Sequence, residues 1–451
     1  MAEHNRFAPC LPRTPAATPL RTDPCRSGTD RGPVDASAPK SFRARTRILL
    51  ALVLAANVLN YLDRQVVSAL EAELRAAFDL DKMAFGALWS AFTIGYMTFA
   101  PAVGYAADRV HRPRLLALCI LVWSAATCAS GLVTTAAGLY AARFFIGVGE
   151  AGCLVIGPAL LADAVPAHVR GRVLSLFYLG MPVGGAAGYL LGGSVRHFGY
   201  GYTVAFLVAG LPGILLASAV APRPDPRRPV QPAGDPAVRA LEHRRPPAPR
   251  DYLRLARRTS FVAIVLAQTF AVAVLAPILH YAVGFFETER GLSPLAATAT
   301  LAGTALVGGL VGAPMAGIVG DRLARTRPEA HALVAAFGYA AAAPLVALVF
   351  GAPSPWVFVP ALFGASTLLF ACMPAVNTQI SLAVPDNQRA MAYALAVFVL
   401  HLLGDMAAPP LFGRFADAVG TGRAFVTFSV LLAAAAFAAF VSARAMRERT
   451  E

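Results

Sequence analysis

The sequence predicts an all-α membrane protein with twelve transmembrane helices arranged as two bundles of six. Composition is the first observation behind this prediction: 57% of the 451 residues are hydrophobic and only 14% are charged. A soluble domain averages about 25% charged residues. The second observation is that long apolar segments recur along the chain, and the third is that one loop motif occurs once in each half.

Each apolar segment is long enough to cross a hydrocarbon core of about 30 Å, which takes about 20 helical residues. The expected spans are 47–77, 83–107, 115–133, 137–164, 171–195, 201–220, 260–286, 294–320, 330–350, 355–384, 390–413 and 422–443. An even number of spans places both ends of the chain on the same side of the membrane.

The segments between and beside the spans define the domain organisation. Residues 1–45 are rich in Pro and Arg and contain no apolar run, so we expect a disordered cytosolic tail rather than a signal peptide. Residues 46–220 form the first predicted bundle and residues 258–443 the second. A Pro- and Arg-rich linker, 221–257, joins them, and 444–451 form a short C-terminal tail.

The net charge of +14 is distributed in a way that indicates orientation rather than nucleic-acid binding. Arginines crowd alternate loops, which is the positive-inside pattern and predicts that both termini are cytosolic in a multi-pass protein of the cell (inner) membrane. These arginines are Arg43, Arg45, Arg47, Arg109, Arg112, Arg114, Arg170, Arg172, Arg322, Arg325, Arg327, Arg444, Arg447 and Arg449.

The six cysteines follow no pairing or metal-binding pattern. Two lie in the N-terminal tail and four lie within apolar spans, where cysteine acts as a small apolar side chain. We therefore expect no disulfide framework, no metal site and no cofactor.

A loop motif of the form P-x-x-G-x-x-x-D-R ends the second span, from Pro101 to Arg109, and the eighth span, from Pro314 to Arg322. Its recurrence indicates a duplicated chain with two halves in parallel order. We expect its glycines to permit close helix approach, its aspartates to accept from a neighbouring helix N-terminus, and its arginines to fix the cytosolic end. The predicted cytosolic gate therefore comprises Gly104, Asp108, Arg109, Gly317, Asp321 and Arg322.

The duplicated motif in a twelve-helix chain resembles the major facilitator superfamily. Three stretches are similar to its spinster branch: Asn60-Tyr61-Leu62-Asp63-Arg64, the segment from Arg143 to Ala151, and His401-Leu402-Leu403-Gly404-Asp405. The resemblance implies the major facilitator fold, in which helices one, four and eleven help to line a central cavity. It also implies transport of a single-chain lipid, since eukaryotic spinster proteins export lysolipids and phosphorylated sphingoid bases.

Acidic groups lie deep within three predicted spans. Asp63 is roughly 24 Å along its helix from Arg47, and a charge at that depth is costly unless it has a partner or faces water. Glu150 and Asp405 lie at similar depths, and His401 is one turn from Asp405. We predict that Asp63, Glu150, His401 and Asp405 carry protons.

Two arginines, Arg64 and Arg143, also lie inside spans. Adjacent residues point apart on a helix, so Asp63 and Arg64 each need a separate partner. Arg143 is two turns from Glu150 on the same face, and we expect its approach to control the protonation of Glu150. The alternatives are a structural ion pair at Arg64 and an Arg143 side chain that reaches the membrane surface.

A guanidinium group grips phosphate or carboxylate in a bidentate manner, so the deep arginines favour an anionic substrate. The predicted substrate-binding set is Arg64, Arg143, Tyr61 and Asn377. His280 is a weaker candidate.

The sequence therefore predicts a proton-coupled secondary active transporter that moves an anionic or zwitterionic amphiphile, such as a lysolipid or sphingoid phosphate, by alternating access. The alternatives are a proton-coupled transporter of small organic or sugar acids, or a drug-type exporter. We expect no enzymatic activity, because no deep nucleophile–base pair or metal cluster is evident. The expected partners are the substrate, protons and the lipid bilayer, and the protein is expected to be a monomer.

Overall fold

The computed structural model describes residues 40–165, 167–226, 249–385 and 388–448, and contains helices and turns but no strand among them. Within these residues, twelve helices are long and apolar enough to cross a membrane, which confirms the predicted all-α class and the number of spans. Most of the predicted N-terminal tail and the middle of the predicted linker lie outside the described residues.

The first bundle is formed by α1 (Lys40–Ala69), α2 (Glu71–Phe78), α3 (Lys82–Ala107), α4 (Arg112–Ser130), α5 (Ala136–Ala164), α6 (Ala167–Tyr178), α7 (Gly180–His197) and α8 (Tyr202–Val220). A short helix, α10 (Pro249–Ala256), lies within the predicted linker.

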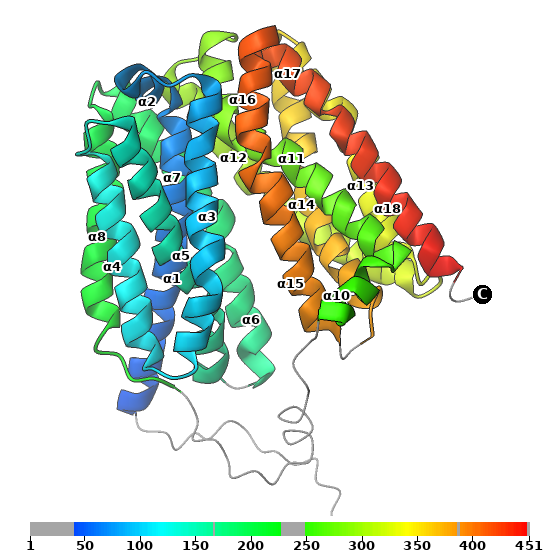
Figure 1. The fold of residues 1–451 in the computed structure, drawn as a ribbon, viewed down its shortest axis with the longest axis horizontal. Helices are drawn as coiled ribbons and strands as arrows, with labels where there is room; N and C mark the ends of the chain where they lie inside the picture. Colours follow the sequence, from blue (N-terminus) through cyan, green and yellow to red (C-terminus); the bar gives the residue numbers. More distant parts are fainter. Residues whose placement is uncertain (1–39, 166, 227–248, 386–387, 449–451) are drawn as a thin grey trace, which may run out of the picture.

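The second bundle is formed by α11 (Thr259–Thr288), α12 (Pro294–Ala324), α13 (Ala330–Gly351), α14 (Pro355–Leu382), α15 (Arg389–Leu400), the π-helical segment η2 (His401–Met406), α16 (Ala408–Val419), α17 (Thr421–Phe428) and α18 (Val430–Arg447). The two bundles stand side by side (Figure 1).

The eleventh predicted span is interrupted by η2, and the sequence explains why. Pro409 and Pro410 lack the N–H groups that would bond the carbonyls of Asp405 and Met406 in a regular helix. The Met406 carbonyl instead accepts a hydrogen bond from Ser90 Oγ of α3 at 2.6 Å. The helix irregularity therefore supplies a polar contact between the bundles.

Within the first bundle, α7 packs closely against α1. Gly184 and Gly188 face the Val58 and Leu62 carbonyls of α1, where any added Cβ would clash with the backbone. Small residues allow such close approach in membranes, where helix association depends on packing rather than on burial from water. This contact fixes the position of the α1 segment that carries Asp63 and Arg64.

The bundles converge at the end that holds α2 and α17, which we call the distal end, and diverge toward α6, α10 and α15, which we call the linker end (Figure 1). Two ion pairs join the bundles at the distal end. Arg196 donates to both carboxylate oxygens of Glu287 at 2.5 and 2.8 Å, and Lys82 Nζ lies 3.6 Å from Asp417 Oδ1.

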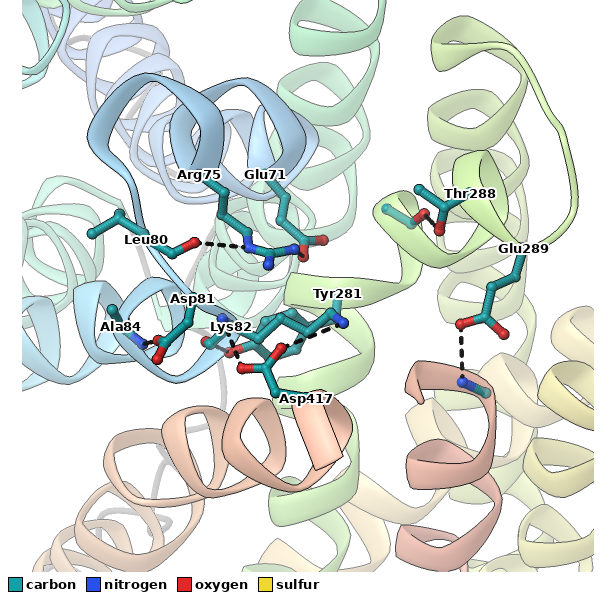
Figure 2. Close-up of polar contacts among 12 residues, drawn as sticks. Glu71, Arg75, Leu80, Asp81, Lys82, Ala84, Tyr281, Thr288, Glu289 and Asp417 are labelled. Atoms are coloured by element: carbon teal, nitrogen blue, oxygen red, sulfur yellow. Dashed lines mark hydrogen bonds and ion pairs between the residues drawn. The ribbon is translucent and has the colours of Figure 1, made fainter. Parts of the chain in front are cut away.

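Tyr281 adds a third connection at the distal end, because its hydroxyl donates to the Lys82 carbonyl at 2.7 Å and lies 3.0 Å from the Pro409 carbonyl. Figure 2 shows Lys82, Asp417 and Tyr281 meeting where helices of both bundles approach. The described contacts thus close the distal end.

The repeated loop motif lies at the linker end, and its glycines are not where helices approach most closely. A Cβ added at Gly317 would meet nothing within 4 Å, and one at Gly104 would make ordinary contact with Val155. The expected close helix approach is therefore not seen at either glycine in this conformation. Gly320 is the crowded position instead, because it faces the His331 ring.

The charged gate residues remain near the helix ends. Arg109 donates to the Tyr105 carbonyl at 3.0 Å and its guanidinium covers the Tyr105 ring. Asp321 Oδ1 lies 3.9 Å from Nε2 of His331, which is in the first turn of α13. Arg322 is exposed. A gate role for these residues stays a prediction.

Candidate functional site

A cavity of about 320 Å³ lies between the two bundles and is lined by side chains from both. The first bundle contributes mainly α1, α3 and α7, and the second contributes mainly α11, α12, α13, α14 and η2. The cavity therefore lies at the interface between the two halves of the fold.

The polar end of the cavity is built around Arg64 of α1. Its guanidinium carbon lies 4.9 to 5.6 Å from the ring centroids of Tyr61, Phe92 and Tyr96, a cation–π arrangement. Its Nε donates to Glu150 Oε2 at 2.6 Å. Arg64 therefore lines the cavity, while the carboxylate of Glu150 on α5 balances its positive charge.

Glu150 is fully buried, and its second oxygen, Oε1, has no hydrogen-bond partner among the described residues. Its ion-pair partner in this conformation is Arg64 of α1, and control of Glu150 by the approach of Arg143 stays a prediction. Two turns of a helix separate Arg143 and Glu150 by about 10 Å along the axis, whereas α1 brings Arg64 directly opposite Glu150.

Arg143 is also buried, at 1% exposure. Its guanidinium lies 5.3 Å from the Phe92 ring centroid, and none of its three nitrogens forms a hydrogen bond within the described part of the chain. It does not border the cavity. The prediction that Arg143 contacts substrate has no geometric support in this conformation.

Asp63 points away from Arg64 toward α4, where Thr127 Oγ1 donates to Asp63 Oδ2 at 3.2 Å. The expectation of separate partners for Asp63 and Arg64 is therefore confirmed. Asp63 is 1% exposed and does not line the cavity, and its role in proton binding stays a prediction.

On the opposite wall, η2 presents His401 and Asp405 to the cavity. His401 Nδ1 lies 2.6 Å from Asp405 Oδ2, and the His401 ring is 5.8 Å from the ring centroid of Tyr96. π-helical segments are rare and occur frequently at functional sites. This pair gives the second bundle a polar group that faces the Arg64 end.

The remainder of the cavity is mostly apolar and extends into the second bundle. Its wall there includes Leu301, Ala305, Leu362, Ala365, Leu369 and Phe370. The cavity therefore joins a cationic end in one bundle to a hydrocarbon-like end in the other.

Two further candidates lie elsewhere. The side chain of Asn377 is exposed and does not line the cavity, although its carbonyl accepts from Tyr393. His280 does line it; its Nδ1 lies 2.9 Å from Ser68 Oγ, and its ring lies 4.3 Å from Trp89. His280 is thus a bridge between the bundles.

Sequence reasoning missed the aromatic wall of α3, formed by Trp89, Phe92 and Tyr96. Their three- and four-residue spacing places them on one helix face, and this periodicity could have revealed them. Thr127 offered no comparable signal. No group of His, Cys, Asp or Glu in the described ranges could hold a metal ion.

A sequence model described as the Major Facilitator Superfamily matches residues 53–409. Protein spinster from Drosophila melanogaster is 26% identical over 373 residues, covering 80% of this chain and 60% of the relative. This chain therefore spans less than two thirds of the length of the fly protein.

Protein spinster homolog 1 from Homo sapiens is 30% identical over 397 residues, covering 83% of this chain and 73% of the relative. A relative from Xenopus tropicalis, described as sphingosine-1-phosphate transporter SPNS2, is 28% identical over 375 residues and covers 80% and 72% of the two chains.

A solved structure of a bacterial homolog of the human lysosomal transporter spinster, described as inward-facing and unoccupied, has the same fold. Its TM-score is 0.77 at 21% identity, covering 91% of this chain and 99% of the other. The family match spans most of the described helices, and the human spinster homolog is similar to this chain over most of the length of both proteins. The chain therefore belongs to the Major Facilitator Superfamily and, within it, to the spinster family.

Proposed function

We propose that this protein is a proton-coupled secondary active transporter that moves an anionic or zwitterionic single-chain amphiphile across the membrane by alternating access. The observation that carries this proposal is the cavity itself, which has Arg64 at one end and an apolar wall at the other. The SPNS2 relative, described as a sphingosine-1-phosphate transporter, supports a substrate of this class.

The two ends of the cavity match the two parts of such a molecule. A phosphate or carboxylate headgroup can form charge-assisted hydrogen bonds with the Arg64 guanidinium, and an acyl or sphingoid chain can fill the wall that includes Leu362 and Leu369. A small sugar acid would leave that wall unfilled, so the amphiphile is favoured over this alternative.

The Arg64–Glu150 pair suggests how a proton couples to the substrate. While Glu150 is charged it occupies Arg64 Nε at 2.6 Å, which leaves less of the guanidinium charge for an anionic headgroup. A proton on Glu150 neutralises the carboxylate and frees Arg64. Proton and anion therefore bind together at this pair.

Alternating access follows from the contacts between the bundles. In the present conformation the distal end is closed by Arg196–Glu287 and Lys82–Asp417. Opening the distal end requires both ion pairs to separate while the linker end closes. We propose that the predicted gate residues Asp108 and Arg109, with Asp321 and Arg322, form the opposing closure.

The proposed substrate class is tested by a thermal-shift screen of the purified protein with lysophospholipids, sphingosine-1-phosphate and sugar acids. A ligand that binds the folded state raises apparent stability by mass action. We expect stabilisation by the amphiphiles and none by the sugar acids. Stabilisation by the sugar acids alone would contradict the proposal.

Ala365→Leu should shorten the longest chain that the cavity accepts. Ala365 is 2% exposed and lines the apolar end, so the added methyl groups occupy space that the chain would fill. We expect about tenfold weaker binding of a long-chain lysolipid, the equivalent of about 1.4 kcal/mol, and unchanged binding of a short-chain analogue.

The matched control is Val359→Leu, which adds a methylene on the exposed side of the same helix. If Ala365→Leu weakened binding of long-chain and short-chain lysolipids equally, the acyl chain would have to lie elsewhere. The same conclusion would follow if the control variant weakened long-chain binding as much.

We also propose that the linker end faces the cytosol, because the arginine-rich loops lie there. A cysteine placed at Glu289, between α11 and α12, should react with a membrane-impermeant maleimide in intact cells. A cysteine at Arg223, beyond α8, should react only after the membrane is permeabilised. The reverse labelling pattern would invert the orientation.

A further inference from the structure

The distal end contains a buried carboxylate that the transport proposal does not use. Glu71 begins α2, and its side chain is 4% exposed. Its Oε1 lies 3.6 Å from Arg75 Nη1, beyond hydrogen-bond distance, and its Oε2 is buried without any hydrogen-bond partner in the described residues. A buried acid in this condition is poorly compensated as an anion.

Glu71 lies on the surface where the two bundles meet. Its carboxylate packs against Gly284 of α11, where a Cβ would overlap Oε2. Figure 2 shows Glu71 and Arg75 extending together from α2 toward the neighbouring helices. The second bundle thus covers Glu71 in this conformation, and separation of the bundles would expose it to water.

Arg75 forms an ion pair with Glu71 at 3.6 Å, and the nearby cations otherwise bind other groups. Arg196 of α7 binds Glu287 through two hydrogen bonds, Lys82 of α3 pairs with Asp417, and Arg75 Nε donates to the Leu80 carbonyl at 3.2 Å. From α11, Glu287 adds negative charge and Tyr281 adds a hydroxyl that is already donated to Lys82.

We propose that Glu71 is a second proton-binding site, separate from the central cavity, whose protonation stabilises the closed distal end. The inference rests on the proposed alternation between two conformations. The proton enters and leaves from the distal side as Glu71 is covered and uncovered, so this site sets the balance between the conformations without itself carrying a proton across.

The electrostatic environment of Glu71 also favours its protonated form in the closed conformation. Burial raises the pKa of Glu71 to about 8, an effect that Arg75, Lys82 and Arg196 oppose and Glu287 reinforces. Once exposed to water, the carboxyl group regains its ordinary pKa of 4.5. At a pH between these two pKa values, closure of the distal end is therefore accompanied by uptake of one proton.

The sign of the pH dependence follows from linkage. Below about pH 4.5 both conformations are protonated at Glu71, and the closed state keeps its full advantage. Between about pH 4.5 and 8 each unit of rising pH shifts the equilibrium toward the open state by up to tenfold, and above pH 8 the shift ends.

Double electron–electron resonance between spin labels at Tyr200→Cys and Trp356→Cys measures this equilibrium without any substrate. The two positions are 58% and 90% exposed and lie beside the distal ends of the two bundles. All variants carry replacements of the six native cysteines and are reconstituted in lipid nanodiscs. We expect the fraction at the longer distance to rise with pH in the parent chain.

Glu71→Gln keeps the size of the side chain and removes its charge, so the distance distribution should no longer change with pH and should favour the closed state. Glu71→Ala provides a second neutral variant with the same expected pH independence, should the amide impair folding. Asp79→Asn removes an exposed acid at the end of the same helix and should retain the parental pH response.

Two populations whose ratio is independent of pH, or a pH response that survives in both neutral variants, would overturn the assignment of Glu71 while leaving alternating access intact. A single invariant distance at every pH would overturn both this inference and the proposed alternation.

Discussion

Glu150→Gln is expected to abolish accumulation of substrate driven by a pH gradient while preserving binding. The amide oxygen can still accept from Arg64 Nε, which lies 2.6 Å from the present carboxylate, so the packing around Arg64 is retained. The titratable group is lost, and the substrate then moves without an accompanying proton. The measurement is uptake in proteoliposomes with and without an imposed pH gradient, alongside exchange at equal pH.

The control is Asp163→Asn, which makes the same acid-to-amide change on α5. Asp163 lies at the linker end, where it accepts from Arg112 at 2.7 Å. Its variant should accumulate substrate as the parent protein does. Normal gradient-driven accumulation by Glu150→Gln would remove Glu150 from the coupling mechanism and direct attention to Asp63 or Asp405.

Arg64→Ala should weaken binding of the anionic amphiphile by about 10- to 100-fold, because a hydrogen bond to a charged group contributes about 1.5 to 3 kcal/mol. Arg64→Lys retains the charge but loses the planar fork and the stacking on Tyr61 and Phe92, so about tenfold weakening is expected. Titration of the purified variants by thermal shift measures both effects.

Removing Arg64 leaves the buried Glu150 without its cation, which destabilises the fold when the carboxylate is charged. The double variant Arg64→Ala/Glu150→Gln relieves this cost, so it separates binding from folding. If the double variant and Arg64→Lys both bind the amphiphile as tightly as the parent, the headgroup lies elsewhere.

Helix geometry was sufficient to predict several features from the sequence. The one-residue spacing of Asp63 and Arg64 required different partners, and the structure provides Thr127 and Glu150. Length and hydropathy were sufficient for the twelve spans. These features depend on local periodicity, which a sequence displays directly.

Features that depend on how helices are rotated against one another could not be predicted. The choice of Arg64 over Arg143 as partner of Glu150 follows from the rotation of α1 relative to α5. The exposed position of Asn377 depends on the rotation of α14.

The burial of Glu71 depends on both bundles at once, because its carboxylate packs against Gly284 of α11. The π-helical segment has a similar origin. Its prolines are evident in the sequence, but the partner of the released Met406 carbonyl, Ser90, lies on the other bundle.

The most direct test of the proposed function is proton-coupled movement of a labelled lysophospholipid in proteoliposomes, followed by extraction of the outer leaflet with albumin. An imposed pH gradient should drive the lipid to an unequal distribution between the leaflets, and a protonophore should collapse it. Substrate binding should also be accompanied by a pH change in weakly buffered solution. A lipid distribution that stays equal under the gradient, with no proton movement, would contradict the proposal.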